Sequence, residues 1–334
     1  MAHRAEINFV KKSHQKSIMQ KENVVGVGVG HKVKRGKRTD EMCIVVLVSK
    51  KLPLQALNPS ALIPKTYDDV DTDVIEVGEL RAQQGRTDRW RPIPGGVTIG
   101  HYKVTAGTMG GMVRDRASNE RLILSNNHVL ANSNEASAGD AILQPGTADG
   151  GRVDRDLVGH LERFQPIQFS VEPPSCSIAL FITRILNKIA EWLGSRHRLI
   201  AVQQNPQAIN LIDAAVAMPL IDIEISDDIL DIGVVGGTAP ATLGMRVRKS
   251  GRSTGFTTGQ ITVVDATVDV NYGQRAARFE NQLISTAMSA PGDSGSLLIA
   301  QDTLLAVGLL FAGSDQVTIY NPIQDVLDGL KVYL

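Results

Sequence analysis

The spacing of apolar positions separates an N-terminal segment from the rest of the chain. Residues 4–21 are polar with scattered apolar positions and predict a surface helix. Two β-branched runs, 24–33 and 41–51, flank a charged turn and predict a β-hairpin. A Pro-containing connection then leads to a further predicted strand over residues 72–80. We therefore expect an N-terminal α+β domain over residues 1–80.

The pattern changes after a segment rich in Gly, Pro and charge at residues 81–95, which we take as a linker. Many short apolar runs separated by Gly-rich turns follow, and such runs predict an all-β sandwich or barrel. The predicted strands lie within residues 105–115, 121–127, 140–146, 156–164, 210–218, 245–251, 259–272, 281–288, 295–300 and 304–313. Residues 96–334 are thus expected to form a second, mainly β domain.

One segment within this β region has helical spacing instead. Residues 176–196 place apolar side chains on one face and polar ones opposite, which predicts an amphipathic helix in an insertion over about residues 170–205. Its apolar face predicts a packed surface or a homo-oligomer contact, and a lid or membrane anchor is the alternative. The N-terminal domain is a second candidate contact of a homo-oligomer. The last residues, 322–334, predict a C-terminal helix.

Composition and charge exclude several classes of protein. The formal net charge is zero, so no overall electrostatic field favours nucleic acid or a membrane surface as a partner. Cys43 and Cys176 are too few for a disulfide-dense secreted scaffold. No apolar run approaches the roughly 18 residues of a spanning helix, and the first residues lack the apolar core of a signal peptide. We expect a soluble, cytoplasmic protein without a membrane span.

The stretch Ala-Pro-Gly-Asp-Ser-Gly-Ser at residues 290–296 contains a candidate nucleophile, Ser294. By itself this sequence fits either a nucleophile turn or an ordinary loop between strands. A serine hydroxyl is a poor nucleophile at neutral pH and needs a base within hydrogen-bond reach. The assignment therefore depends on partners elsewhere in the chain.

His128 is the candidate base, because imidazole titrates near neutral pH. It follows an apolar strand and a Ser-Asn-Asn turn in Arg-Leu-Ile-Leu-Ser-Asn-Asn-His. A histidine that caps a turn is the alternative interpretation of this stretch. Ordinary structural or surface roles are expected for the other histidines, which are His3, His14, His31, His101, His160 and His197.

Asp213 is the candidate carboxylate that orients the imidazole. It precedes Ala-Ala-Val-Ala, where an acid is poorly solvated and needs a polar partner. The competing acids lie in Gly-rich or charged loops where solvation explains them; they are Asp140, Asp149, Asp154 and Asp156.

The chain order His128, Asp213, Ser294, within SNNHVLA, IDAAVA and GDSGSL, resembles the chymotrypsin/trypsin-like serine peptidases. Residues 247–261 and 306–315 also resemble, respectively, the start of the second barrel and the strand that lines the specificity pocket in that family. In detail the chain is most similar to intracellular bacterial trypsin-like proteins and to the plant narrow-leaf-type proteins related to them. The similarity runs roughly from residue 96 to residue 325, outside the N-terminal domain.

This resemblance implies two six-stranded antiparallel β-barrels, one over about residues 96–220 and one over about residues 235–320. His128 and Asp213 would belong to the first barrel and Ser294 to the second. It further implies a serine endopeptidase that cleaves protein or peptide substrates through an acyl-enzyme, without a metal or cofactor.

The resemblance also assigns the surroundings of the nucleophile. The backbone N–H groups of Gly292 and Ser294 would form the oxyanion hole. The implied specificity pocket has its floor and walls at Met288, Phe311, Ala312 and Gly313. Because no acid stands there, we expect a substrate with an apolar side chain.

Asp293 is a candidate regulatory residue. In zymogen-type relatives this aspartate pairs with a newly cleaved N-terminal amine, and Arg91 is available here for such a cleavage. The alternative is that another side chain holds Asp293. The N-terminal domain would accordingly be removed or act as a regulator.

Two other functions are compatible with the same residues. One is a regulated or catalytically weak binding or scaffold protein with a trypsin-like fold. The other is an acyl hydrolase that uses the triad on a different substrate.

Overall fold

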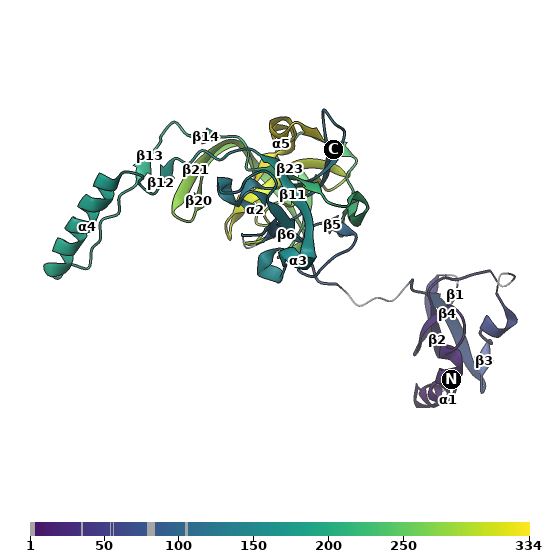
Figure 1. Ribbon diagram of the computed structural model, residues 1–334. Helices are drawn as coiled ribbons and strands as arrows, with labels where there is room; N and C mark the ends of the chain where they lie inside the picture. Colours follow the sequence, from purple (N-terminus) through teal and green to yellow (C-terminus); the bar gives the residue numbers. More distant parts are fainter. Residues whose placement is uncertain (1–3, 35, 54, 56, 79–83, 104–105) are drawn as a thin grey trace. The chain divides into compact units, whose positions relative to one another are not determined.

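The computed structural model describes residues 4–34, 36–53, 55, 57–78, 84–103 and 106–334 (Figure 1). The chain divides into two units, Met1–Gln84 and Gly85–Leu334. The division falls within residues 81–95, the expected linker, of which 81–83 lie outside the described residues. Residues of this segment from Gly85 onward belong to the second unit.

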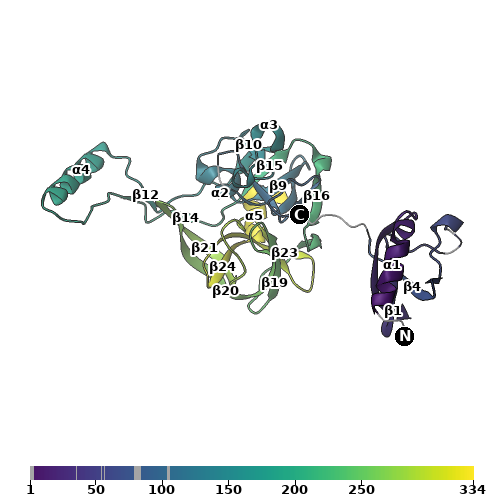
Figure 2. The same ribbon diagram turned by 90° about the horizontal axis from the view of Figure 1, so that it is seen from below.

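The first unit is an α/β structure. The described residues form α1 (Arg4–Met19), β1 (Val24–Lys34), β2 (Lys37–Val48), the 3₁₀ turn η2 (Pro59–Ala61), β3 (Thr66–Tyr67) and β4 (Val70–Glu76). The sheet has the order β1-β2-β4-β3, with β1–β2 antiparallel, as predicted, and β2–β4 parallel. Its core joins one face of α1 to the sheet through Ile7, Val10, Ile18, Ile44, Val46, Val48 and Val70 (Figure 2).

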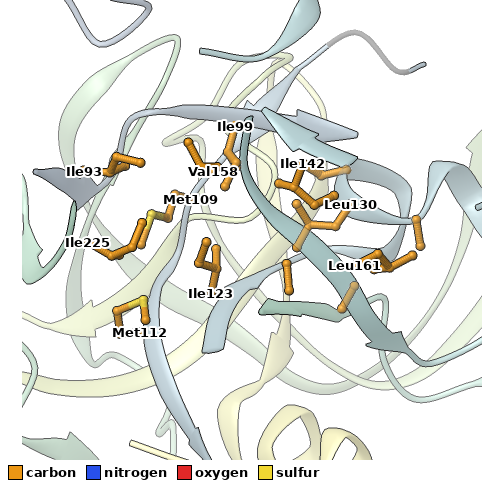
Figure 3. Packing of buried hydrophobic residues seen from close by; sticks show 14 of the residues in the cluster. Ile93, Ile99, Met109, Met112, Ile123, Leu130, Ile142, Val158, Leu161 and Ile225 are labelled. Atoms are coloured by element: carbon orange, nitrogen blue, oxygen red, sulfur yellow. The ribbon is translucent and has the colours of Figure 1, made fainter. Parts of the chain in front are cut away.

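The second unit contains two large sheets and one small one. Within the described residues the first has the order β25-β8-β9-β15-β11-β10-β6-β7. Its strands are β6 (Thr98–His101), β7 (Gly107–Thr108), β8 (Gly111–Asp115), β9 (Arg121–Ser125), β10 (Ala141–Leu143), β11 (Leu157–Phe164), β15 (Ala215–Pro219) and β25 (Val332–Tyr333). The small sheet consists of β5 (Ile93–Gly95), β16 (Ile225–Ile229) and β17 (Gly233–Val234). Figure 3 shows the core formed where these strands turn their apolar faces toward each other.

The second large sheet has the order β13-β12-β21-β20-β19-β22-β23-β18 in the described chain, and β14 pairs with β21. Strand β24 pairs with β21 on one side and with β23 on the other. The strands are β12 (Val171–Glu172), β13 (Gln203–Gln204), β14 (Ile209–Asn210), β18 (Gly237–Thr238), β19 (Arg246–Gly251), β20 (Gly255–Tyr272), β21 (Arg275–Thr286), β22 (Leu297–Ala300), β23 (Leu305–Gly313) and β24 (Val317–Pro322). The long alternating run of β20 forms a hairpin with β21.

Four α-helices among the described residues connect these strands. They are α2 (Asn127–Leu130), α3 (Val153–Asp156), α4 (Ser177–Trp192) and α5 (Ile323–Leu330), with 3₁₀ turns η3 (Asn132–Asn134), η4 (Thr147–Asp149) and η5 (Asp222–Glu224). The apolar face of α5 packs against residues of both large sheets, including Leu122, Leu124, Leu297 and Leu309. The C-terminal helix is shorter than predicted, because Lys331 takes a left-handed conformation (φ 56°) and Val332–Tyr333 then pair with β8.

The predicted mainly β architecture with an N-terminal α/β region is therefore confirmed, as is the helix within the β region. This arrangement positions the candidate site, because the loop after β9, the loop before β15 and the turn before β22 carry His128, Asp213 and Ser294.

Candidate active site

His128 lies on the turn that follows β9 and begins α2. The buried side chain of Asn126 donates a hydrogen bond from Nδ2 to the backbone oxygen of Asp213 (2.7 Å). Nδ2 of Asn127, also buried, donates to the backbone oxygen of Gln165 (2.7 Å). A buried amide without partners would cost free energy, so these bonds fix the turn in one conformation. Asn127 is thus a bonded part of the turn.

The carboxylate of Asp213 is fully buried and accepts hydrogen bonds at both oxygens. Its Oδ2 lies 2.6 Å from Nδ1 of His128 and 2.8 Å from the hydroxyl oxygen of Tyr272. Its Oδ1 accepts a hydrogen bond from the backbone N–H of His128 (3.2 Å). An ionised carboxylate only accepts hydrogen bonds, so Nδ1 of His128 is the donor and Nε2 is left to accept a proton.

Tyr272 is a residue of this site that the sequence analysis did not identify. It ends β20, and its ring meets those of His128 and Phe169 edge-on, with ring centroids 5.9 Å and 5.8 Å away. Burial raises the pKa of the Tyr272 hydroxyl well above its usual value, and the charge of Asp213 raises it further. The hydroxyl therefore remains protonated and donates. Tyr272 and Asp213 are 59 positions apart in the sequence, so their contact depends on the path of the β20–β21 hairpin. No local sequence pattern predicts that path.

Ser294 lies on a turn that requires glycine on both sides. Gly292 and Gly295 both have φ of 99°, a left-handed conformation that other residues adopt only with strain. A Cβ atom at Gly295 would lie 2.1 Å from the backbone oxygen of Thr108, and one at Gly292 would lie 2.5 Å from Nη1 of Arg252. The backbone N–H of Thr108, in β7, donates to the backbone oxygen of Ser294 (2.7 Å). The turn before β22 is thereby tied to the first large sheet.

The same turn leaves two backbone N–H groups open. Two other N–H groups of the turn are bonded: that of Asp293 donates to the carbonyl oxygen of Ala290 (3.0 Å), and that of Gly295 donates to the carbonyl oxygen of Leu310 (2.8 Å). By contrast, the N–H groups of Gly292 and Ser294 have no acceptor within the described residues. They are the two groups that the resemblance assigned to an oxyanion hole, and they are free to bind a ligand oxygen.

The hydroxyl of Ser294 does not reach His128 in this structure. Its Oγ lies 3.5 Å from the backbone oxygen of Phe311, and among the described residues no hydrogen bond joins it to the imidazole. Such bonds are often long in enzymes without substrate and tighten when substrate binds. The structure therefore brings His128 and Asp213 together and leaves the third contact of the predicted triad unformed.

Asp293 has a cationic partner, Lys249 of β19. Both side chains are fully buried, and Nζ of Lys249 lies 3.0 Å from Oδ2 of Asp293. The hydroxyl of Thr254 (2.6 Å) and the backbone N–H of Ser253 (2.8 Å) also donate to this carboxylate. Burial alone would raise the pKa of Asp293, but the charge of Lys249 and the hydrogen bonds from Thr254, from the backbone N–H of Ala290 and from Lys249 lower it. Burial lowers the pKa of Lys249, which the charge of Asp293 opposes.

This ion pair bears on the expected regulation. The carboxylate of Asp293 is already paired with the side chain of Lys249. This agrees with the alternative interpretation, in which another side chain holds Asp293 and no newly cleaved N-terminal amine is needed. Lys249 was missed by the sequence analysis, because it stands between Arg248 and Ser250 in a polar strand, where no local pattern marks it as buried. Arg91 is half-buried and lies 2.8 Å from Oε1 of Gln144 and 3.2 Å from Oε2 of Glu224, so cleavage after it would require these contacts to open.

The four residues of the predicted specificity pocket differ in how exposed they are and in which atoms face Ser294. Met288 is 4% exposed, and its sulfur accepts a hydrogen bond from the hydroxyl of Tyr320 (3.3 Å). The ring of Phe311 is buried against Phe279, with centroids 4.7 Å apart, so Phe311 presents its backbone and not its side chain to Ser294. Ala312 is half-buried and Gly313 is exposed.

Two of the competing acids are not solvated, contrary to expectation. The side chain of Asp149 is 7% exposed and pairs with Arg252 (2.5 Å), and that of Asp156 is 2% exposed and pairs with Arg155 (2.8 Å). Their arginine partners make burial tolerable. Neither carboxylate is bonded to His128.

In the described part of the chain, no group of three or more His, Cys, Asp or Glu residues is placed to hold a metal ion. No helix among the described residues has the length and apolar character to cross a membrane.

Sequence comparison with known proteins adds two similarities. Residues 5–77 match the family described as the NARROW LEAF 1 N-terminal domain. Over 313 residues the chain is 25% identical to Protein NARROW LEAF 1 of Oryza sativa subsp. japonica, a match that covers 82% of this chain and 48% of that protein. Over 93 residues it is 41% identical to Streptogrisin-D of Streptomyces griseus, which covers 26% of this chain and 22% of that protein. The chain has a trypsin-like serine protease fold related to that of NARROW LEAF 1.

The relation to NARROW LEAF 1 includes the first unit, because the matched N-terminal domain lies within it. The candidate triad of the trypsin-like fold lies in the second unit. Among solved structures, the Nocardiopsis protease NAPase aligns over 72% of this chain and 98% of its own, with 17% identity and a TM-score of 0.46.

Proposed function

We propose that this chain is a serine endopeptidase that hydrolyses peptide bonds through an acyl-enzyme. Oγ of Ser294 attacks the carbonyl carbon while Nε2 of His128 takes the hydroxyl proton. The N–H groups of Gly292 and Ser294 bind the oxyanion of the tetrahedral intermediate. His128 then gives its proton to the leaving amine, and the C–N bond breaks. A water molecule, deprotonated by His128, hydrolyses the acyl ester and restores Ser294.

The observation that carries this proposal is the contact of 2.6 Å between the buried carboxylate of Asp213 and Nδ1 of His128, in the unit where the nucleophile turn keeps two N–H groups open. Asp213 orients the imidazole and stabilises the imidazolium that forms during the reaction. Tyr272 is a positioning residue in this scheme, because it acts on His128 through Asp213.

We also infer that each half of the second unit is a six-stranded antiparallel barrel. In the second half, β24 joins the two ends of the run β21-β20-β19-β22-β23. In the first half, residues 107–115 pair with β6 through β7 and with β9 through β8. These pairings support a closed ring of strands in each half.

The substrate proposed is a protein or peptide with an apolar side chain at the residue whose carbonyl is attacked. Met288, which stands at the implied pocket floor, carries no charge to bind a basic side chain, and it belongs to a hydrophobic cluster with Val247, Ile261 and Leu298. Peptide amides that differ only in this residue, Phe or Leu against Arg, test the preference directly.

The nucleophile is tested by reaction with a fluorophosphonate, which labels an activated serine. The wild-type chain is expected to be labelled and Ser294→Ala is not. Ser118→Ala, an exposed serine in a different turn, serves as the matched control and should label as the wild type. Equal labelling of the wild type and Ser294→Ala would contradict the assignment.

One observation favours a second function. Because Ser294 makes no hydrogen bond to His128 among the described residues, the fold also suits a protein that binds peptides and turns them over weakly. Peptide binding without fluorophosphonate labelling would support that function. Rapid cleavage of esters with no cleavage of matched amides would instead indicate an acyl hydrolase.

A further inference from the structure

Helix α4 lies in an insertion between strands of the second unit, and the described part of that unit buries none of its residues. It lies between β12 and β13, which pair with each other, and β12 also pairs with β21 through Val171 and Ala276. Figure 1 shows α4 at the end of this short ribbon. Within the described chain, none of its residues is buried. Tertiary packing therefore does not account for its apolar residues.

The two faces of α4 have different surroundings. On one face, Asn187 exchanges two hydrogen bonds with the backbone of Leu199 (2.9 Å and 2.7 Å). Thr183 and Glu191, together with the basic residues Arg184 and Lys188 at the edge of this face, line a hollow between α4 and residues 199–202. The polar face thus meets the returning chain. The opposite face carries large apolar side chains at helical spacing, each between 41% and 86% exposed: Ile178, Phe181, Ile182, Ile185, Leu186, Ile189, Trp192 and Leu193. An apolar face turned outward in this way marks an interaction site.

The charge of the insertion restricts what covers this face. The insertion, residues 170–205, contains four basic residues and two acidic residues, Glu172 and Glu191, which gives a formal charge of +2 in a chain whose total is zero. The basic residues are Arg184, Lys188, Arg196 and Arg198. Within the described residues none of them forms an ion pair that would neutralise it. A partner surface that is apolar and negatively charged would complement both features.

A second copy of the chain fits this requirement poorly, since two such insertions would bring like charges together. An anionic lipid surface fits it well. Acyl chains cover an apolar helix face, and lipid phosphates attract basic residues beside it. Trp192, at the C-terminal end of the helix, is of the residue type enriched at membrane interfaces. A helix of 16 residues is about 24 Å long, shorter than the roughly 30 Å hydrocarbon core, so it lies on the surface and does not cross it.

We propose that the exposed apolar face of α4 and the basic residues beside it bind the protein to the surface of an anionic phospholipid bilayer. The side chains that enter the lipid are those of the outward face, and Arg184, Lys188, Arg196 and Arg198 contact the phosphates. This role is separate from the hydrolysis of peptides, and it holds whether or not Ser294 is reactive.

The test is co-sedimentation of the full-length chain with phosphatidylcholine vesicles that contain or lack phosphatidylglycerol. We expect binding to the anionic vesicles and at least tenfold weaker binding to the neutral ones. Ile185→Glu should lose binding, because it places a charge on the outward face. Thr183→Glu, which adds the same charge on the polar face, is the matched control and should keep most of it. Arg184→Gln with Lys188→Gln should weaken binding about 30-fold.

Absence of wild-type binding to the anionic vesicles, or equal loss in Ile185→Glu and Thr183→Glu, would overturn the proposal. A dimer in lipid-free solution that Ile185→Glu dissociates would also overturn it, in favour of a second copy as the occupant. Both single substitutions are at residues that are not buried, and the urea unfolding curve of each variant confirms that it is folded.

Discussion

At the scale of single residues, the shared acceptor Oδ2 of Asp213 links a tyrosine to the candidate base. His128 and Tyr272 both donate to this oxygen, at 2.6 Å and 2.8 Å. A carboxylate that accepts from two side chains and one backbone N–H has little freedom to rotate. The orientation of the imidazole therefore depends on Tyr272 as well as on Asp213.

Tyr272→Phe is expected to lower kcat about ten- to hundredfold, which matches loss of a hydrogen bond to a charged group worth about 1.5–3 kcal/mol. KM should change little, because the hydroxyl does not touch the substrate. The phenylalanine ring preserves the contacts with His128 and Phe169. Steady-state kinetics on a peptide amide measure the effect, and Tyr333→Phe, which removes a hydroxyl bonded to Asn119 outside the site, is the control. An unchanged kcat would show that Asp213 needs no support from Tyr272.

At the scale of elements, β19 and the turn before β22 are joined by the Lys249–Asp293 pair. Removing one partner of a buried ion pair leaves an uncompensated charge, which costs about 3–5 kcal/mol. The same turn holds Ser294 and the two open N–H groups. Loss of the ion pair that disorders the turn would therefore also disrupt the candidate oxyanion hole.

Lys249→Met is expected to lower the free energy of unfolding by about 3–5 kcal/mol and to slow fluorophosphonate labelling. The double variant Lys249→Met, Asp293→Asn removes both charges and should regain part of the stability. Urea unfolding of the wild type and both variants measures the difference. A Lys249→Met protein as stable as the wild type would show that the pair does not hold the turn.

The pair also predicts a pH dependence. The pKa of Asp293 is lowered in the folded state, so its contribution to stability is present above the ordinary carboxyl value of about 3.9 and is lost as the pH falls through the lowered value. The double variant should lack this component of the decline in acid.

Local sequence patterns were sufficient to predict the elements whose apolar residues recur with a single period. The alternation in β20 and the helical spacing in α4 and α5 specify each element by itself. Two-residue strands such as β13 and β25 were not predicted, because pairing with a distant strand creates them. Such strands have no period of their own.

The candidate site was likewise predictable only where its residues stand in local sequence motifs. His128, Asp213 and Ser294 stand in short motifs that can be recognised in the sequence, and their order implied their association. Tyr272 and Lys249 could not be assigned in this way, because their roles arise from contacts across 59 and 44 residues. The solvation expected for Asp149 failed for the same reason, since its arginine partner is remote in sequence.

At the scale of the whole molecule, the two units have separate hydrophobic cores. The core of the first unit is built from α1 and its own sheet, and the clusters of the second unit contain no residue before Ile93 among the described residues. Each unit therefore has the means to stay folded by its own packing.

Ile44→Ala tests whether the first unit controls the site. Ile44 is fully buried in the first core, so the substitution should destabilise that unit by about 2–5 kcal/mol. Because the candidate triad residues lie in the other unit, we expect the rate of fluorophosphonate labelling to stay unchanged. A changed labelling rate would instead support the regulatory role expected for the N-terminal domain.

The hydrogen bond from Thr108 to Ser294 has a consequence for the order in which the protein becomes active during synthesis. His128 and Asp213 emerge from the ribosome before Ser294 exists, and the nucleophile turn takes its shape against β7 of the earlier half. Neither half alone contains a working set of groups. The proposed hydrolysis would therefore require that the last third of the chain has docked, and a partly made chain would not carry it out.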